Sequence, residues 1–192
     1  MLETLKQVDT QLLLFFNHLN NSFFDFIFFW ISDKFIWIPF YLMLAFFFIR
    51  KFKSDFIWIL VFVACVIVVS DQLASSVIKP LVMRLRPCHE PSILSKIHLV
   101  KGYCGGQFGF ISSHAANTFA LAAFATKVIP QSFKGFVPMM WIWASLVSFS
   151  RIYLGVHYPA DVLVAALLGI VIGFFFAKLC LVCINKYSSK KV

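Results

Sequence analysis

The chain has 192 residues, of which 61% are hydrophobic, 18% aromatic and only 13% charged, and its formal net charge is +9. Soluble globular domains carry about 25% charged residues, so this composition excludes an ordinary soluble domain and predicts an integral membrane protein. We expect an all-α fold in which 1–192 form a single domain, a polytopic membrane helix bundle with five or six transmembrane helices.

Residues 1–34 combine apolar stretches with a polar patch. The apolar segment 12–16 is followed by a mostly polar patch at 17–22 before a second apolar segment begins. A transmembrane helix over 4–32 would bury that patch at mid-membrane, where unpaired polar groups are costly. We therefore expect one or two helices that lie at the membrane interface, with a sixth span as the alternative. Residues 1–11 contain acids rather than a basic segment, so we expect no cleavable signal peptide.

Five long apolar runs predict the membrane-spanning helices. A helix needs about 20 residues to cross the hydrocarbon core, and some of the runs are shorter, so we expect tilted or interrupted spans among them. The runs lie at 35–49, 56–78, 115–129, 136–150 and 159–184.

The first of three polar clusters follows the second apolar run. Lys79 and Arg86 lie seven residues apart, so a helical segment would direct both toward one point, although Pro80 and Pro87 predict some departure from regular helix. Arginine offers a planar fork to phosphate oxygens, and lysine offers a point charge. The alternative is that both are snorkelling residues that meet lipid phosphates.

The second and third clusters each lie at the start of an apolar run. Ser112 and Ser113 lead into a helix start with His114, where free backbone amides and the helix dipole favour an anion. His157 and Asp161 lie four residues apart around the start of the last run, so the carboxylate can hold one imidazole nitrogen and leave the other free. Taken singly, a histidine at the interface is more often a solvated or capping residue, and an acid there stabilises a helix start.

Counting the spans brings all three clusters to one membrane face. If 56–78 rises to that face, the polar loop 79–114 stays there. The run 115–129 then descends, a turn at 130–135 reverses the chain, and the next run returns to deliver Arg151. The topology therefore predicts a single site built from the three clusters.

The opposite face carries the basic residues that set orientation. Short cytoplasmic loops are enriched in lysine and arginine, so we expect the site on the outer (periplasmic) face of the inner (plasma) membrane. The basic residues of the opposite face are Arg50, Lys51, Lys53, Lys127, Lys134, Lys186, Lys190 and Lys191.

Two cysteines flank the polar loop on the expected outer face. In an oxidising compartment, Cys88 and Cys104 are typical of a disulfide. The alternatives are two incidental loop thiols, or metal ligation together with His89 or His98, for which the paired zinc-ligand spacing is missing. His18, His89 and His98 fit none of the clusters, and we interpret them as surface residues.

The motifs of the three clusters resemble those of the type 2 phosphatidic acid phosphatase superfamily, in its membrane-bound bacterial lipid phosphatase branch. The middle motif departs from the Pro-Ser-Gly-His of that family, because Ile111 replaces proline and Ser113 replaces glycine. Losing the glycine restricts φ at a point where a backbone amide should approach the phosphate. The matching motifs are Lys79 with Arg86-Pro87, Ser112-x-His114, and Ser150-Arg151 with His157 and Asp161.

The resemblance implies a two-step mechanism that uses neither metal nor cofactor. His157 would attack phosphorus and form a phosphohistidine, while Asp161 orients and stabilises the imidazolium. His114 would protonate the leaving oxygen and then activate water. The residues expected to hold the equatorial phosphate oxygens are Lys79, Arg86, Ser112, Ser113 and Arg151. Asp71 is left open, because it could pair with a site cation or with the neighbours of Gln72.

The expected substrate is an amphiphile whose phosphate lies at the interface. We place undecaprenyl diphosphate first, lipid A or another glycolipid phosphate second, and phosphatidylglycerophosphate or phosphatidic acid third. The expected partners are this lipid phosphate and membrane lipids, with no nucleic acid, and the oligomeric state is open. Rival functions are a lipid phosphotransferase and a non-catalytic lipid-binding or transport protein, which would not need His114, His157 and Asp161.

Overall fold

Helices make up nearly all of the regular structure in the computed structural model, which describes residues 2–129 and 135–188. Within these residues, pairing of β type is limited to an isolated bridge between Leu85 and Phe108. The all-α prediction is therefore confirmed. The α-helices are α1 (Leu2–Asn17), α2 (Ser22–Ser32), α3 (Ile38–Phe52), α4 (Phe56–Gln72), α5 (Lys79–Val82), α6 (Ser113–Val128), α7 (Phe136–Tyr153) and α8 (Pro159–Ser188).

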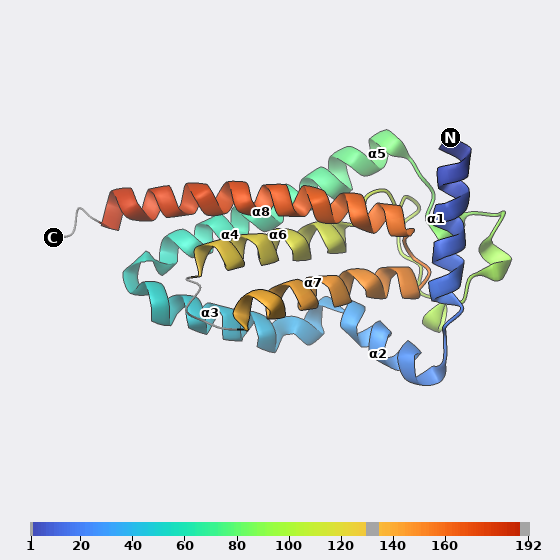
Figure 1. The fold of residues 1–192 in the computed structure, drawn as a ribbon, viewed down its shortest axis with the longest axis horizontal. Coiled ribbons are helices and arrows are strands. Elements are labelled where there is room, and N and C mark those ends of the chain that lie inside the picture. Colours follow the sequence, from blue (N-terminus) through green and yellow to red (C-terminus); the bar gives the residue numbers. More distant parts are fainter. Residues whose placement is uncertain (1, 130–134, 189–192) are drawn as a thin grey trace.

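The long helices form a bundle, and α1 lies across one of its ends. Figure 1 shows α3, α4, α6, α7 and α8 running along the long axis of the molecule, whereas α1 is nearly perpendicular to them. The turn between α3 and α4 and the last turns of α8 lie at the opposite end. This arrangement fits a bundle that crosses a membrane with α1 at its surface, although an interfacial position for 1–34 stays a prediction.

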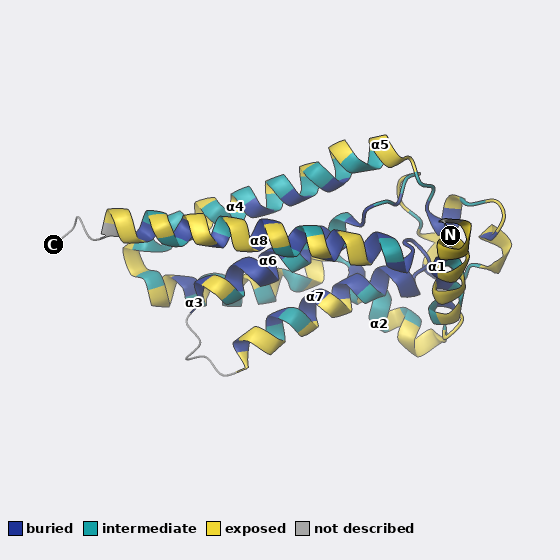
Figure 2. Cartoon of the chain, turned by 45° about the horizontal axis from the view of Figure 1, so that its top comes forward, coloured by how far each residue is buried: buried dark blue, intermediate teal, exposed yellow. Residues whose placement is uncertain are grey.

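The outer surface of the bundle is apolar. Leu163, Leu167 and Val171 repeat every four residues on α8, and all three side chains are exposed. Figure 2 shows such exposed positions along the outer sides of α4 and α8, while most of α6 is buried. A continuous apolar stripe of this kind is unfavourable in water and is what a helix presents to lipid.

Small residues let α6 and α8 pack closely. Gly169 and Gly173 lie one turn apart on α8, and a Cβ atom on either would meet backbone atoms of Ala116 or Ala120 on α6. Closely packed membrane helices commonly use this spacing of small residues. The contact also joins the starts of the two helices, because the backbone N–H of Ser112 donates to the carbonyl oxygen of Asp161 at 3.1 Å.

Backbone irregularities shape the segment from α3 to α5. Two stretches of the described chain are long and apolar enough to cross a membrane, Lys34–Val82 and Pro159–Tyr187. The first reverses direction at Lys53, whose φ is 48° (Figure 1). It then continues from α4 through a π-helical turn at Leu73–Ile78 into α5, so the helix predicted at 56–78 extends further than its apolar run.

The other long helices lie close to their predicted ranges. The run at 115–129 corresponds to α6, and the runs at 136–150 and 159–184 correspond to α7 and α8. The turn predicted at 130–135 lies outside the described residues except for Gly135. Lys134, Lys190 and Lys191 lie outside them as well.

The polar patch near the N-terminus fastens the long loop between α5 and α6. The side chain of Asn17 is buried, and its amide donates to the carbonyl oxygens of His98 at 2.9 Å and Tyr153 at 2.7 Å. Its oxygen accepts from the backbone N–H of His98 at 2.8 Å. His98 lies at the surface, as expected, but its ring is partly buried and pairs with Asp25 at 2.8 Å. His18 and His89 are exposed, as expected.

Candidate active site

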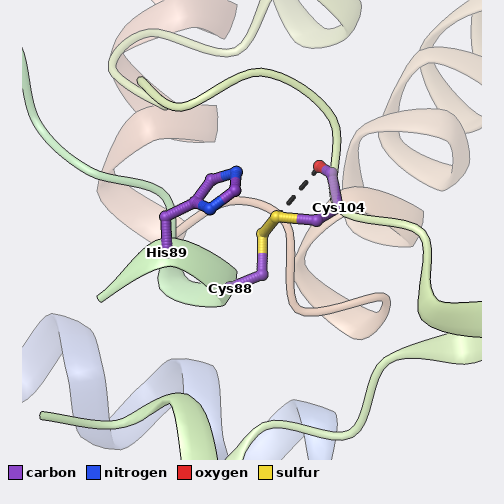
Figure 3. Close-up of side chains that lie close together, drawn as sticks. All are labelled: Cys88, His89 and Cys104. Carbon is purple, nitrogen blue, oxygen red and sulfur yellow. Dashed lines mark hydrogen bonds between the residues drawn. A yellow bond between two sulfur atoms is a disulfide. The ribbon is translucent and has the colours of Figure 1, made fainter. Parts of the chain in front are cut away.

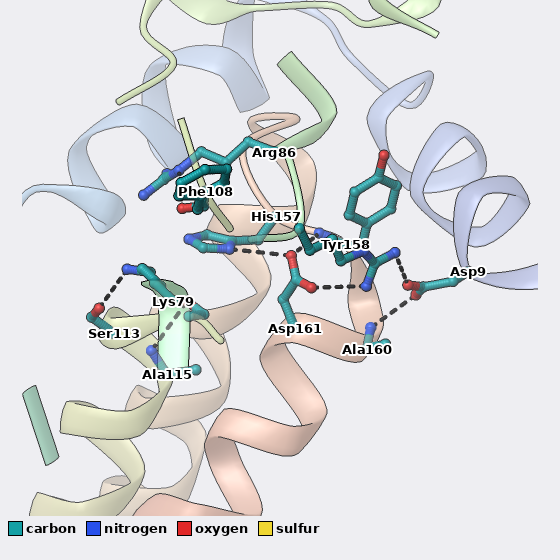
Figure 4. Close-up of polar contacts among 12 residues, drawn as sticks. Asp9, Lys79, Arg86, Phe108, Ser113, Ala115, His157, Tyr158, Ala160 and Asp161 are labelled. Carbon is teal, nitrogen blue, oxygen red and sulfur yellow. Dashed lines mark hydrogen bonds and ion pairs between the residues drawn. The ribbon is translucent and has the colours of Figure 1, made fainter. Parts of the chain in front are cut away.

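The structure gathers the three polar clusters at the end of the bundle nearest α1. Several helix ends meet there, and each contributes one or two side chains (Figure 4). These side chains are Lys79 of α5, Ser113 and His114 of α6, Arg151 of α7, Asp161 of α8, His157 of the connection before α8, and Arg86 of the loop after α5.

His157 and Asp161 form a buried pair. The Nδ1 atom of His157 lies 3.4 Å from Oδ2 of Asp161, which also accepts from the backbone N–H of Tyr158 at 3.0 Å. Figure 4 shows the other ring nitrogen of His157 facing away from Asp161, toward the side where Lys79 lies. Burial, followed by the positive charges of Arg86 and other nearby cations, lowers the pKa of His157 well below its usual 6.5. The ring is therefore neutral near pH 7 and keeps a lone pair for attack.

The second oxygen of Asp161 is held by a residue that the motifs did not indicate. The guanidinium of Arg84 donates to Oδ1 of Asp161 at 2.8 Å and to Oδ2 of Asp9 at 2.6 Å. It also stacks over the ring of Tyr158, with its carbon 3.8 Å from the ring centroid. Asp9 in turn accepts from the backbone N–H of Ala160 at 2.8 Å. Arg84 therefore fixes the carboxylate that orients His157.

We expect Arg84→Gln to lower kcat by about 10- to 100-fold, the effect of losing one hydrogen bond between charged groups. KM should change little, because Arg84 contacts Asp161 rather than the expected phosphate position. Steady-state kinetics in detergent check this, with Arg50→Gln at the opposite end of the bundle as the matched control. Wild-type kcat in Arg84→Gln would contradict this role for Arg84.

Three cations near His157 have no acidic partner, in contrast to Arg84. Within the described residues, none of Lys79, Arg86 and Arg151 forms an ion pair with a carboxylate. Arg86 and Arg151 are nevertheless almost completely buried. A buried charge without a counter-ion is costly, so such a group marks a place for an anion.

The neutral contacts of these cations leave hydrogen-bond donors free. Arg86 donates to the carbonyl oxygens of Phe108 at 3.3 Å and Cys104 at 3.2 Å. Arg151 donates through one terminal nitrogen to Oγ of Ser32, and its buried Nε has no partner in the described structure. These donors are available to phosphate oxygens.

Lys79 and Arg86 do not lie on one helix, in agreement with the departure from regular helix that Pro80 and Pro87 predicted. The helix ends after Val82, where Met83 has φ of 50°, and the chain then becomes extended. The N–H of Arg86 donates to the carbonyl oxygen of Gln107 at 3.0 Å. Both cations still approach the same site, because the extended strand folds back beside the start of α6.

The serines of the middle motif have different contacts. Ser112 is fully buried and caps α6, since its Oγ accepts from the N–H of Ala115 at 3.5 Å. Ser113 has no positive φ and begins α6, so serine fits the backbone at the position where the resembled motif has glycine. Its Oγ accepts from Lys79 Nζ at 2.8 Å and lies 2.8 Å from Oγ of Ser75. Direct phosphate contact by either serine stays a prediction.

Cys88 and Cys104 are joined by a disulfide, with their Cα atoms 5.9 Å apart. Figure 3 shows the bond beside the ring of His89, whose ligand atom lies within 4.8 Å of both sulfur atoms. Disulfide sulfurs are not thiolates, so this arrangement does not supply the ligands of a zinc site. The carbonyl oxygen of Cys104 holds Arg86, which connects the bridge to the site.

We expect loss of the bridge to lower activity more than membrane insertion. Cys88→Ser with Cys104→Ser should reduce the free energy of unfolding by about 3 kcal/mol according to the chain-entropy account. It should also loosen the loop that positions Arg86. Mass spectrometry of non-reduced protein from cells checks the linkage, with Cys65→Ser as the control. Free thiols at both positions in cells would contradict the bridge.

Comparisons with known proteins find relatives over most of the chain. The profile of the PAP2 superfamily matches residues 56–184. The chain is 36% identical to the lipid A 4'-phosphatase of Bacteroides thetaiotaomicron, over 92% of this chain and 78% of that protein. It is 33% identical to the lipid A 4'-phosphatase of Porphyromonas gingivalis, over 92% of this chain and 75% of that protein.

A solved structure has the same fold at low sequence identity. The first transmembrane PAP2 type phosphatidylglycerolphosphate phosphatase from Bacillus subtilis superposes with a TM-score of 0.67 and 20% identity. The match covers 91% of this chain and 85% of that one. The motif-bearing part of this chain lies inside the region that the family profile matches, and the likeness to the solved structure concerns the fold.

Proposed function

We propose that this chain, which belongs to the PAP2 superfamily, hydrolyses a phosphate ester on the sugar head group of a lipid A-type glycolipid and so removes the phosphate. The chain is a membrane lipid phosphatase and a phosphoric ester hydrolase. The observation that carries the choice of substrate is the identity of 36% and 33% with two lipid A 4'-phosphatases over 92% of the chain. Undecaprenyl diphosphate, which the sequence placed first, has weaker support.

The proposed reaction begins with attack by His157. Its Nε2 atom forms a bond to phosphorus as the bond to the lipid oxygen breaks, and His114 gives that oxygen a proton. Water then attacks the phosphohistidine, His114 takes the proton of that water, and the N–P bond breaks to release phosphate. Asp161 stabilises the imidazolium, and its contact with Arg84 keeps the carboxylate oriented.

The phosphate oxygens would be held by the three cations that form no ion pair with a carboxylate of the described residues. Lys79, Arg86 and Arg151 balance the charge of the equatorial oxygens in both steps. The amides at the start of α6, next to Ser112 and Ser113, add the positive end of a helix dipole. These donors are already in place within a largely buried site, so little reorganisation is needed during the reaction.

The proposed topology places this site on the periplasmic face of the inner membrane. The helices α3, α4, α6, α7 and α8 would cross the bilayer, and residues 1–34 would lie at the interface. The basic residues of the α3–α4 turn are at the end of the bundle opposite to the site (Figure 1), which supports a cytoplasmic position for that end. Residues 1–192 would then form one domain, with 79–114 as its outer-face loop.

A panel of lipid phosphates tests the function. Purified protein in detergent with a chelator is given lipid A, undecaprenyl diphosphate, phosphatidylglycerophosphate and phosphatidic acid, and free phosphate is measured. We expect the highest kcat/KM for lipid A. A higher kcat/KM for another lipid would replace the proposed substrate. Transfer of phosphate to an added lipid without free phosphate would indicate a phosphotransferase, and binding without turnover would indicate a non-catalytic protein.

A further inference from the structure

A cavity of about 610 Å³ opens beside His114, between α3, α4, α6 and α7. Ligand pockets for small molecules span roughly 300–1,000 Å³. The cavity is polar near the site, where Ser113, His114 and Asn117 line it, and apolar along its remaining length, where Phe56 and Ile59 are among the lining residues. The cavity therefore matches an amphiphile, with a polar end for the head group and an apolar length for the hydrocarbon chain.

The cavity extends along α4 from its first turn to its last. Phe56 and Asp71 both line it and lie fifteen residues apart on that helix, which corresponds to roughly 22 Å of helix length. Asp71 therefore lies at the polar end and Phe56 at the far end of the bundle. A hydrocarbon chain in the apolar part would place its head group between Asp71 and His114.

Asp71 is held in this position by a neighbouring amide. The side chain of Asn117 donates to Oδ1 of Asp71 at 3.1 Å, and Asn117 accepts from Oγ of Ser70 at 2.5 Å. In the described structure the other carboxylate oxygen, Oδ2, accepts no hydrogen bond from protein. The sequence left open whether Asp71 pairs with a site cation. Among the described residues, no cation lies within ion-pair distance of Asp71.

The chemistry of Asp71 differs from that of the phosphate site. An ionised carboxylate only accepts hydrogen bonds, and it repels a phosphate. Asn117 follows His114 by one helical turn on the same side of α6, and His114 is the proposed acid for the leaving oxygen. Asn117 thereby holds the carboxylate of Asp71 at the polar end of the cavity, beside the proposed acid, where the head group of a bound lipid would lie.

We propose that Asp71 is a specificity-determining residue that accepts a hydrogen bond from a hydroxyl or amide N–H group of the leaving group. This inference rests on the proposed function, and it identifies the substrate class as lipids whose phosphate is attached to a head group with such donors. A phosphorylated, acylated sugar carries both kinds of donor. A polyprenyl diphosphate presents a second phosphate and a hydrocarbon chain instead, which leaves the carboxylate unpaired and adds repulsion.

The test compares Asp71→Asn with wild type on three lipids. Asparagine keeps the shape but removes the charge and offers donors of its own. The lipids are lipid A, phosphatidylglycerophosphate, whose leaving group has a glycerol hydroxyl, and undecaprenyl diphosphate. Gln72→Ala is the matched control, because Gln72 is adjacent but exposed. Asn117→Ala, which releases Asp71 from its partner, is a second variant that keeps the carboxylate.

We expect kcat/KM of Asp71→Asn for lipid A to fall about 10- to 100-fold, the effect of losing a hydrogen bond to a charged group. The value for the diphosphate should stay within about 2-fold or rise, because repulsion is removed. Asn117→Ala should also lower kcat/KM for lipid A more than kcat/KM for the diphosphate, but by a smaller factor. An equal loss on all three lipids, or no loss on lipid A, would overturn the inference.

Wild-type rates and variant ratios answer separate questions. If wild type prefers undecaprenyl diphosphate, the proposed function fails. The proposed role of Asp71 in selecting the leaving group is then judged by whether Asp71→Asn lowers kcat/KM for phosphatidylglycerophosphate relative to kcat/KM for the diphosphate. An unchanged ratio between those two lipids would overturn the inference independently of the proposed function.

Discussion

Replacing His157 by alanine is expected to abolish phosphate release, with a loss of roughly 10⁴-fold or more in kcat. The proposed nucleophile is then absent, and Asp161 cannot take its place, because its carboxylate is engaged by Arg84 and by the N–H of Tyr158. Lipid binding should persist, since the cations remain. The measurement combines phosphate release with binding of radiolabelled lipid A to the purified variant.

Trapping the intermediate makes the test specific for His157. Rapid quenching of wild type at alkaline pH, where an N–P bond survives, should give a phosphorylated peptide that contains residue 157. This peptide should be missing from His157→Ala and present in His18→Ala, the control at an exposed histidine. Wild-type turnover by His157→Ala, or phosphate trapped at another residue, would rule out the proposed nucleophile.

His114→Ala is expected to lower kcat for lipid A by about 10²- to 10⁴-fold, the usual contribution of a general acid and base. A sugar alkoxide is a poor leaving group and needs a proton, whereas an aryl phosphate leaves without one. We therefore expect the first step to be much less impaired with para-nitrophenyl phosphate. Phosphohistidine should then accumulate, because water activation remains slow.

Burst kinetics separate the two roles of His114. His114→Ala with the aryl phosphate should release one equivalent of nitrophenol rapidly and then turn over slowly. Thermal unfolding in detergent should show that the half-buried position tolerates alanine. Equal losses on both substrates without a burst would argue that His114 acts only by binding.

The class of protein and the residues of the candidate site could be predicted without the structure. Apolar runs of membrane-spanning length predicted the helices, because burial in lipid depends on local composition. Counting the spans predicted that Lys79, His114 and His157 meet at one end, because each span reverses the direction of the chain. Motif spacing named the residues, and Pro80 and Pro87 predicted a departure from regular helix between Lys79 and Arg86, although not the point where the helix ends.

Tertiary structure decided which polar groups hold the site together. Arg84 lies 77 residues from Asp161 and 75 from Asp9, and their contacts follow from how α1 crosses the end of the bundle. Asn17 reaches Tyr153 across 136 residues. Local pattern carries no information on such pairs, since a charged or amide side chain near a helix end has the same sequence context whether it meets solvent, lipid or a distant partner.

Asp71 illustrates the same division for specificity. Its position in an apolar run indicated that it has some role, because an acid within a membrane helix needs a reason. Its partner Asn117, and the cavity that both line beside His114, arise from the packing of α4 against α6. Composition and spacing therefore determined the membrane class, the helices and the candidate site residues, while three-dimensional packing decided which groups hold those residues in place and which side chains line the cavity beside them.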